Sequence, residues 1–355
     1  MAAGPAEIRS GADYSGEHNR MPDKIIDIKK LTVSFGAGDN PLQVVSGISF
    51  DICKGEVFGL VGESGSGKSM TALSVLRILP ENAFTTGSII FREKDLLAIS
   101  EEEMRAIRGR DIAMIFQEPM TSLNPVLTIG FQVAEALLAH YDISKAEAMD
   151  RAVGLLKAVS MPSPETRIKD YPHQLSGGMR QRVMIATAIA CNPALLIADE
   201  PTTALDVTIQ AQILELLQNL RRERDMAVLL ITHDLSIISE QAERVAVMYA
   251  GRIMELASVE ELFRNTLHPY TIGLLESLPD KKGVTLRPIP GFVPSPDQYP
   301  AGCKFSDRCF MAIEDCNKAE PGLVEIRPGH YVRCIRVDGY SAEVQKLGRA
   351  ESGHR

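Results

Sequence analysis

The eight residues GESGSGKS (62–69) constrain the fold of this chain more than any other stretch. A strongly apolar run, EVFGLVG (56–62), precedes them, and a helical run that ends before Pro80 follows them. Glycines let backbone N–H groups turn inward around a polyphosphate, and the start of the helix adds its positive dipole end. The sequence therefore predicts a strand, a phosphate loop and a helix in succession. In such a loop Lys68 reaches the β and γ phosphates and Ser69 ligates Mg²⁺.

Apolar runs elsewhere in the chain predict the class of the domain. PALLIADEP (193–201) and MAVLLITHD (226–234) are continuously apolar, as buried parallel strands are. Between them, apolar residues recur at three and four residue intervals over 208–225, which predicts an amphipathic helix. KIIDIKKLTVSF (24–35) is rich in β-branched residues and predicts a further strand. Strands that alternate with helices indicate an α/β domain with a largely parallel sheet.

Two further stretches supply residues that a nucleotide site needs. LLIADE (195–200) places Asp199 at the end of a buried strand, where a carboxylate can hold the metal ion. Glu200 follows, where a base could polarise the attacking water. An acidic pair after a strand often merely faces solvent, but the phosphate loop in the same chain argues for the metal role. LSGGMRQRV (175–183) opens a helix with a hydroxyl residue and two glycines, which makes a second anion cradle.

With these motifs in this order, the sequence resembles the ATP-binding subunits of ABC transporters over about residues 24–265. The resemblance implies that one loop binds ATP through Gly62, Glu63, Ser64, Gly65, Ser66, Gly67, Lys68 and Ser69. It implies that Phe35 stacks on adenine, that Gln117 in IFQEP is the Q-loop glutamine, and that TALD (203–206) is the D-loop. It assigns Mg²⁺ to Ser69, Gln117 and Asp199, and catalysis to Glu200 and His233, the switch histidine in ITHD. Ser176, Gly177 and Gly178 would form the signature motif that covers ATP held by a second ATPase subunit.

Longer stretches resemble the ATPases of bacterial dipeptide and oligopeptide importers, especially their D subunit. HPYTIGLLESLP (268–279) resembles the start of the C-terminal extension that those proteins share. The resemblance implies a P-loop ABC ATPase domain with an inserted helical subdomain, which hydrolyses ATP to drive a peptide importer. The partners that it implies are a related F-type ATPase chain, two membrane permease subunits and, indirectly, a periplasmic or extracellular binding protein. It places the chain peripherally on the cytoplasmic face of the bacterial inner membrane.

Changes in composition and hydrophobic pattern along the chain predict the domain boundaries. We expect disordered tails at 1–22 and 341–355, an ATP-binding domain at 23–265 with a helical subdomain at about 118–175, and a C-terminal extension at 266–340. The first of these tails lacks the apolar core of a signal peptide, so we expect a cytoplasmic protein with reduced thiols. RPIPGFVPSPDQYP (287–300) has too many prolines for a helix and predicts an extended connector.

Four of the six cysteines lie in the extension, at Cys303, Cys309, Cys316 and Cys334. Four thiolates can complete a tetrahedral zinc site or hold the irons of a [4Fe–4S] cluster. The spacing lacks the paired C-x-x-C knuckles of structural zinc, which favours the cluster. The resemblance points the same way, because peptide-importer ATPases with this cysteine pattern carry a [4Fe–4S] cluster. Zinc and metal-free packing thiols are the alternatives.

The sequence leaves other functions to be weighed. A soluble ABC ATPase that acts on nucleic acid or ribosomes is one alternative, but the formal net charge of −8 and the single copy of each motif argue against it. A non-hydrolysing partner is another, although Lys68, Asp199, Glu200 and His233 are all present. The solute stays open among dipeptides, longer peptides, glutathione and nickel chelates, because this chain does not touch it. A homodimer and a heterodimer are both compatible with the sequence.

Overall fold

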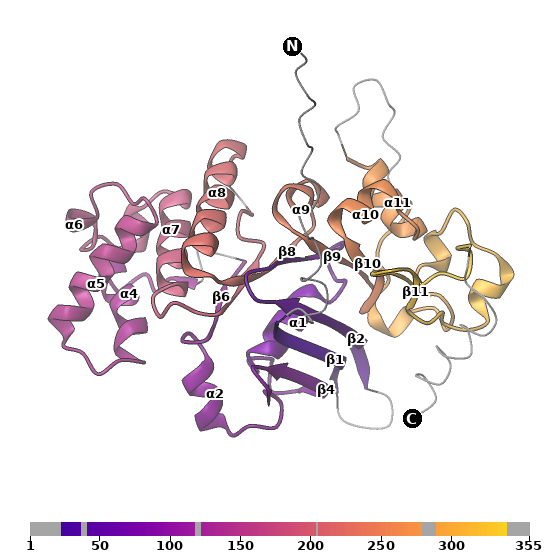
Figure 1. Ribbon diagram of the computed structural model, residues 1–355, viewed down its shortest axis with the longest axis horizontal. Helices are drawn as coiled ribbons and strands as arrows, with labels where there is room; N and C mark the ends of the chain where they lie inside the picture. The colour runs from indigo at the N-terminus through magenta and orange to yellow at the C-terminus, as the bar shows by residue number, and fades with distance from the viewer. Residues whose placement is uncertain (1–22, 37–40, 118–121, 204, 279–288, 339–355) are drawn as a thin grey trace, which may run out of the picture.

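A computed structural model describes residues 23–36, 41–117, 122–203, 205–278 and 289–338 (Figure 1). Both predicted tails, 1–22 and 341–355, lie outside these residues, and so do the last two residues of the predicted extension, 339–340. The strands are β1 (Lys24–Phe35), β2 (Leu42–Cys53), β3 (Val57–Val61), β4 (Ala83–Phe91), β5 (Lys94–Asp95), β6 (Ile112–Ile115), β7 (Leu195–Asp199), β8 (Ala227–Thr232), β9 (Arg244–Tyr249), β10 (Arg252–Ser258), β11 (Val324–Arg327) and β12 (His330–Val332). The α-helices are α1 (Lys68–Val75), α2 (Glu101–Ile107), α4 (Ile129–Leu138), α5 (Lys145–Ala158), α6 (Pro164–Arg167), α7 (Gly177–Ala188), α8 (Val207–Arg224), α9 (Leu235–Gln241), α10 (Val259–Arg264) and α11 (Pro269–Glu276). Short 3₁₀ turns are η1 (Pro172–Gln174), η2 (Pro296–Gln298), η3 (Ser306–Arg308) and η4 (Glu314–Asn317).

An eight-stranded sheet forms the centre of the molecule, in the order β11-β12-β10-β9-β3-β8-β7-β6. The five strands from β9 to β6 run parallel, and β10, β12 and β11 continue the sheet antiparallel at one edge. This arrangement confirms the α/β class with a largely parallel sheet. Parallel strands β3, β8 and β7 therefore end side by side, close to the start of α1.

The parallel strands are apolar throughout because both of their faces are buried. In β3, Phe58 and Leu60 belong to one buried cluster, whereas Val57 and Val61 belong to the other. Alternate side chains of a strand point to opposite faces, so a strand covered on both sides needs apolar residues at every position. Gly59 lies where a Cβ atom would come within 2.7 Å of the Ile238 side chain. A helix thus packs directly on the strand that precedes the phosphate loop.

One face of the central sheet is covered by α1 and by a second, four-stranded antiparallel sheet in the order β2-β1-β4-β5 (Figure 1). The strand predicted at 24–35 has the bounds of β1, but its pairing in a separate sheet was not predicted. Helix α2 packs into the same cluster as α1 through Met104 and Ile107, and the other face carries the helices from α4 onward. Helices α4, α5 and α6 lie in the segment predicted to be a helical subdomain, and in Figure 1 they lie at the opposite end of the molecule from the C-terminal segment.

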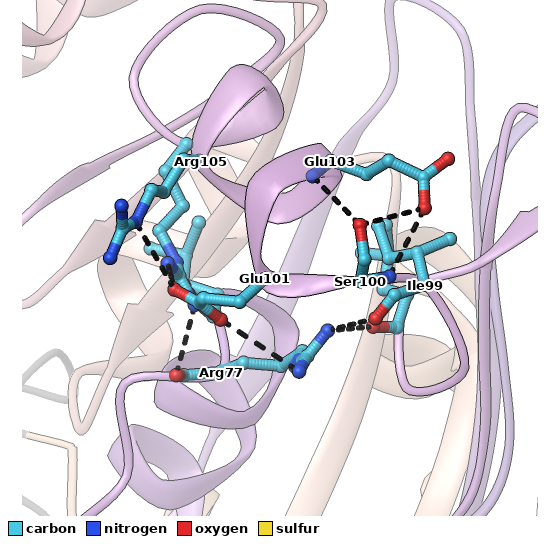
Figure 2. A network of polar contacts seen from close by, with 9 residues as sticks. Arg77, Ile99, Ser100, Glu101, Glu103 and Arg105 are labelled. Carbon is cyan, nitrogen blue, oxygen red and sulfur yellow. Dashed lines mark hydrogen bonds and ion pairs between the residues drawn. The ribbon is translucent and has the colours of Figure 1, made fainter.

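A polar network anchors the far end of helix α1 (Figure 2). Arg77, which follows α1 closely, donates from Nη1 to the carbonyl oxygen of Ile99 at 2.7 Å. Ser100 caps helix α2 by accepting from the backbone N–H of Glu103 at 3.2 Å, and the Glu103 carboxylate accepts from the backbone N–H of Ser100 at 3.1 Å. This reciprocal arrangement is a capping box, which stabilises the start of a helix. Helix α1 is therefore fixed at the end opposite the phosphate loop.

The C-terminal extension shares the sheet and the core of the rest of the chain. Strand β12 pairs with β10, with Glu255 opposite Val332. Tyr270 and Phe305 are fully buried in the same apolar cluster as the central strands. The extension therefore uses the common core rather than a separate one of its own. None of the described helices combines the length and the apolar character needed to cross a membrane.

Candidate active site

The loop between β3 and α1 has the backbone that its glycines allow. A Cβ atom on Gly62 would lie 2.0 Å from the carbonyl oxygen of Met248, so no side chain fits there. Gly65 and Gly67 have φ angles of 80° and 102°, a region that other residues rarely adopt. Ser64 lies exposed at the tip of the loop, and Ser66 is buried. The glycine pattern is therefore a requirement of this loop conformation.

Lys68 lies inside the loop at the start of α1. Its Nζ atom donates to the carbonyl oxygens of Gly62 and Glu63, at 2.7 and 3.0 Å. Burial lowers the pKa of Lys68, and the nearby charges of Glu200 and Asp199 oppose that effect. A buried ammonium group between the loop and two carboxylates is a strong centre for binding an anion.

Asp199 ends strand β7 beside this lysine. Burial raises the pKa of Asp199, while a hydrogen bond with Ser69 and the charge of Lys68 act in the opposite direction. The Oδ1 atom of Asp199 and the Oγ atom of Ser66 are buried and, within the described part of the chain, lack a hydrogen-bond partner. Buried polar atoms nearly always have partners. These two atoms therefore indicate that the cradle receives a polar ligand, and their chemistry fits a phosphate and a hard cation.

Three loops bring further polar side chains to Glu200. It accepts a hydrogen bond from Thr203 Oγ1 at 2.8 Å and from Gln117 Nε2 at 3.1 Å, and its Oε1 atom lies 3.2 Å from Nδ1 of His233. Burial alone would raise the pKa of Glu200, but the Thr203 and His233 interactions lower it. The carboxylate is therefore charged near neutral pH, as a proton acceptor must be. Glu200 has a φ of 47°, a left-handed backbone that is rare for glutamate and frequent at functional sites.

The predicted signature residues lie elsewhere on the surface. Ser176 caps α7 by accepting from the backbone N–H of Met179 at 3.4 Å. Gly178 packs against helix α8, because a Cβ atom there would lie 2.8 Å from Ile209. Figure 1 shows α7 among α4, α5 and α8, well separated from α1. The structure therefore does not bring the two predicted anion cradles of one chain together.

Phe35 and Asp206, the last residue of the predicted D-loop, contact other parts of the fold. Phe35 is partly buried at the end of β1 and packs against the core. Of the predicted D-loop TALD (203–206), Ala204 lies outside the described residues, and Asp206 caps α8 by accepting from the N–H of Ile209 at 3.0 Å.

Glu63 has two partners in the structure that no sequence motif indicates, Arg308 and Tyr270. The guanidinium group of Arg308 forms a two-point ion pair with the Glu63 carboxylate, at 2.8 and 3.0 Å. The backbone N–H of Glu63 donates to the hydroxyl group of Tyr270 at 3.0 Å. Burial would lower the pKa of Arg308, but the Glu63 carboxylate raises it overall. No local sequence signal could reveal these contacts, because they join residues more than two hundred positions apart.

The four cysteines of the extension line one cavity, together with His268 and Phe305 among others. None of the four forms a disulfide bond. The cysteine-bearing loops approach closely at Gly302, where a Cβ atom would lie 2.2 Å from the carbonyl oxygen of Cys316. The fold thus brings together thiols that are separated along the chain by five, six and seventeen residues.

Burial dominates the electrostatics of these thiols. It raises the pKa of Cys303 to about 12 and that of Cys334 to about 11, and it also raises the pKa of Cys309. Such thiols stay protonated near neutral pH unless a cation replaces the protons. Over the residues that the structure covers, no group of three or more His, Cys, Asp or Glu side chains is arranged to hold a metal ion.

Comparison with protein families gives two matches. Residues 45–203 match the family described as "ABC transporter", and residues 254–316 match the family described as "Oligopeptide/dipeptide transporter, C-terminal region". The first match spans the phosphate loop, the signature residues and the carboxylates at the end of β7. The second spans the extension as far as Cys316.

Individual relatives give the same result over most of the chain. It is 50% identical to a probable peptide ABC transporter ATP-binding protein of Sinorhizobium fredii, over 90% of this chain and 97% of that protein. It is also 50% identical to the oligopeptide transport ATP-binding protein AppD of Bacillus subtilis, over 90% of this chain and 98% of that one. Among solved structures, it is similar to the dimeric ATP-binding cassette MJ0796 bound to ADP and phosphate, with a TM-score of 0.59 and 29% identity. That likeness covers 66% of this chain and 98% of the other.

Proposed function

The chain belongs to the ATP-binding subunits of peptide ABC transporters, and from this premise we propose that it is the energy-coupling ATPase of a dipeptide or oligopeptide importer. The observation that carries the catalytic part is the convergence of Lys68, Asp199 and Glu200 at the carboxyl ends of β3 and β7. The match of residues 254–316 to the C-terminal region of oligopeptide and dipeptide transporters supports the solute class.

In this proposal, the loop between β3 and α1 binds ATP. The backbone N–H groups of residues 62–69 surround the phosphates, and Lys68 turns from the loop carbonyl oxygens to the β and γ phosphates. Phe35 stacks on the adenine ring. Mg²⁺ would bind Ser69, Asp199 and Gln117, and it supplies charge neutralisation between the phosphates.

Hydrolysis requires a base and a way to hold the attacking water. Glu200 accepts the proton of that water, because its pKa is lowered and its carboxylate stays ionised. His233 lies 3.2 Å from this carboxylate and orients it from the opposite loop. Gln117 donates to the same carboxylate, so a movement of the segment after β6 changes the environment of the base. In this proposal, hydrolysis is therefore coupled to the conformation of the helical segment.

A second ATPase subunit would complete the site. Ser176, Gly177 and Gly178 lie on the surface away from their own phosphate loop, and the similar MJ0796 cassette forms a dimer with ADP and phosphate bound. We therefore assign these residues to the nucleotide of the partner, in a heterodimer with a related F-type chain. Closure of the pair would act on two permease subunits at the cytoplasmic face of the bacterial inner membrane, while a binding protein delivers the solute.

The four cysteines would hold a [4Fe–4S] cluster. The proposal rests on the chemistry of four thiols around one cavity and on their spacing, rather than on a preformed coordination geometry. When bound, a cluster would cross-link the loops of the extension. Iron and acid-labile sulfide measured in anaerobically purified chain test the proposal: iron and sulfide in equal amounts support it, and zinc or no metal contradicts it.

One experiment tests the importer function. A tagged full-length chain should co-purify permease subunits from detergent-solubilised membranes, and the complex should hydrolyse ATP faster when peptide-loaded binding protein is added. Lys68→Ala serves as the inactive control. Co-purification of ribosomes or nucleic acid without permeases would support the soluble alternative instead. If nickel chelate or glutathione, but not peptides, stimulated ATP hydrolysis, the transported solute would be one of those compounds instead of a peptide.

A further inference from the structure

Glu63, the second residue of the phosphate loop, is held by residues of the C-terminal extension. Both oxygens of its carboxylate accept from Arg308, at 2.8 and 3.0 Å, and its backbone N–H donates to Tyr270 at 3.0 Å. Its carbonyl oxygen accepts from Lys68 at 3.0 Å. The side chain, the N–H and the carbonyl oxygen of one loop residue are therefore all fixed, two of them by the C-terminal extension.

The two extension residues are themselves rigid. Arg308 is buried, and it also donates to the carbonyl oxygens of Pro290 and Gly291, at 2.8 and 3.2 Å, and to the hydroxyl group of Tyr249 at 3.4 Å. Tyr270 is fully buried and packs against Tyr249 with ring centroids 4.8 Å apart. Buried, planar Arg–carboxylate pairs with fixed partners are strongly directional. The extension thus presents a preformed support to the loop.

The charge of Glu63 gives this support a second consequence. A carboxylate in a loop that receives a polyphosphate repels the ligand unless a cation neutralises it. Among the described residues, Arg308 is the cation paired with this carboxylate. Removal of Arg308 would therefore both free the loop and leave an unpaired negative charge beside the phosphates.

We propose that Arg308 and Tyr270 are positioning residues for the phosphate loop, so that the C-terminal extension sets the affinity of the chain for ATP. The inference rests on the proposed function only in taking residues 62–69 as the ATP site. Arg308 lies in the short turn η3 between Cys303 and Cys309, so whatever fixes these two sulfur atoms also fixes the guanidinium group. The thiol cavity and the phosphate loop are in this way mechanically linked.

Calorimetric titration of the full-length chain with ATP and Mg²⁺ tests the proposal. We expect Arg308→Met to raise the Kd about tenfold and Arg308→Lys to raise it less. We expect Tyr270→Phe, which removes only the acceptor hydroxyl, to weaken binding as well. The control is Glu320→Gln, which removes another ion pair between the extension and the core, with Arg252 at 2.7 Å, and does not touch the loop. Its Kd should match that of the wild type.

A merely structural role makes different predictions. If Arg308 acts through the loop, adding Glu63→Gln to Arg308→Met should restore part of the lost affinity, because no unpaired carboxylate remains. In the assembled transporter, Arg308→Lys should raise KM for ATP while leaving kcat at saturating ATP unchanged. Equal Kd values for the wild type, Arg308→Lys and Tyr270→Phe would overturn the proposal, and so would an equal loss in Glu320→Gln. A wild-type chain that does not bind ATP would instead overturn the proposed function.

Discussion

Replacing Glu200 by glutamine removes a proton acceptor while it keeps the volume of the side chain. The amide oxygen of a glutamine can still accept from Thr203, which donates to Glu200 at 2.8 Å. The free energy of unfolding should therefore change by less than about 1 kcal/mol. The substitution isolates the chemical role of the carboxylate from its structural one.

The size of the effect follows from the role. Loss of a positioned general base slows a reaction by about 10²–10⁴-fold, which corresponds to about 2.7–5.4 kcal/mol of transition-state stabilisation. The affinity for ATP should not fall. Glu200 is close enough to Lys68 to shift its pKa, so loss of this negative charge beside the phosphate loop removes a repulsion.

Two assays on the assembled transporter separate these effects. Phosphate release at saturating ATP and Mg²⁺ should drop by the factor above in the Glu200→Gln variant, while calorimetric titration should give a Kd equal to or below that of the wild type. Glu240→Gln, on the exposed surface of α9, is the matched control. A Glu200→Gln enzyme that turns over within about threefold of the wild type would refute the assignment of Glu200 as the base.

Three further predictions concern stability. His330 Nε2 lies 2.8 Å from buried Glu255. Burial lowers the pKa of His330, but the interaction with Glu255 raises it overall. The His330–Glu255 pair therefore stabilises the fold below the unfolded pKa of about 6.5, and this stabilisation is lost as pH rises through the folded pKa. Urea unfolding should therefore show a steeper loss of stability with rising pH in the wild type than in His330→Leu, and equal slopes would contradict this reasoning. Phe305→Ala, which empties a buried site beside Tyr249, should lower the free energy of unfolding by about 3–5 kcal/mol, and a loss below about 1 kcal/mol would show that the extension does not depend on this packing. Gly178→Ala should lower the free energy of unfolding by about 1–3 kcal/mol, because its Cβ would meet Ile209 at 2.8 Å, and an unchanged free energy would contradict the close packing of α7 on α8.

The local parts of the fold were predictable from the sequence. The runs at 56–62, 193–201 and 226–234 each contain a parallel strand, and the periodic segment 208–225 differs from α8 by one residue at each end. These elements carry their signal in their own residues, as continuous burial or helical periodicity. The antiparallel sheet of β1, β2, β4 and β5 and the edge strands β10 to β12 were not predicted, because their stability comes from pairing between distant segments.

The candidate site shows the same division. Lys68, Asp199, Glu200, Gln117 and His233 were singled out by motif and order, and the structure brings them together. The cysteines were singled out by number and spacing, and they line one cavity. No sequence motif predicts the contacts between Glu63 and the extension. Arg308 and Tyr270 contact Glu63 only because the tertiary fold brings the extension to the phosphate loop.

We infer that the phosphate loop of one subunit is completed by the signature residues of another. Gly177→Arg tests it most directly, because a Cβ atom at Gly177 meets nothing closer than Leu205 at 3.5 Å, so the chain tolerates a side chain there. The measurement is phosphate release by the assembled transporter, alongside the Kd for ATP of the isolated variant chain. We expect an unchanged Kd and a strong loss of hydrolysis at the site that this signature covers. Hydrolysis at the wild-type rate by the assembled Gly177→Arg complex would contradict it.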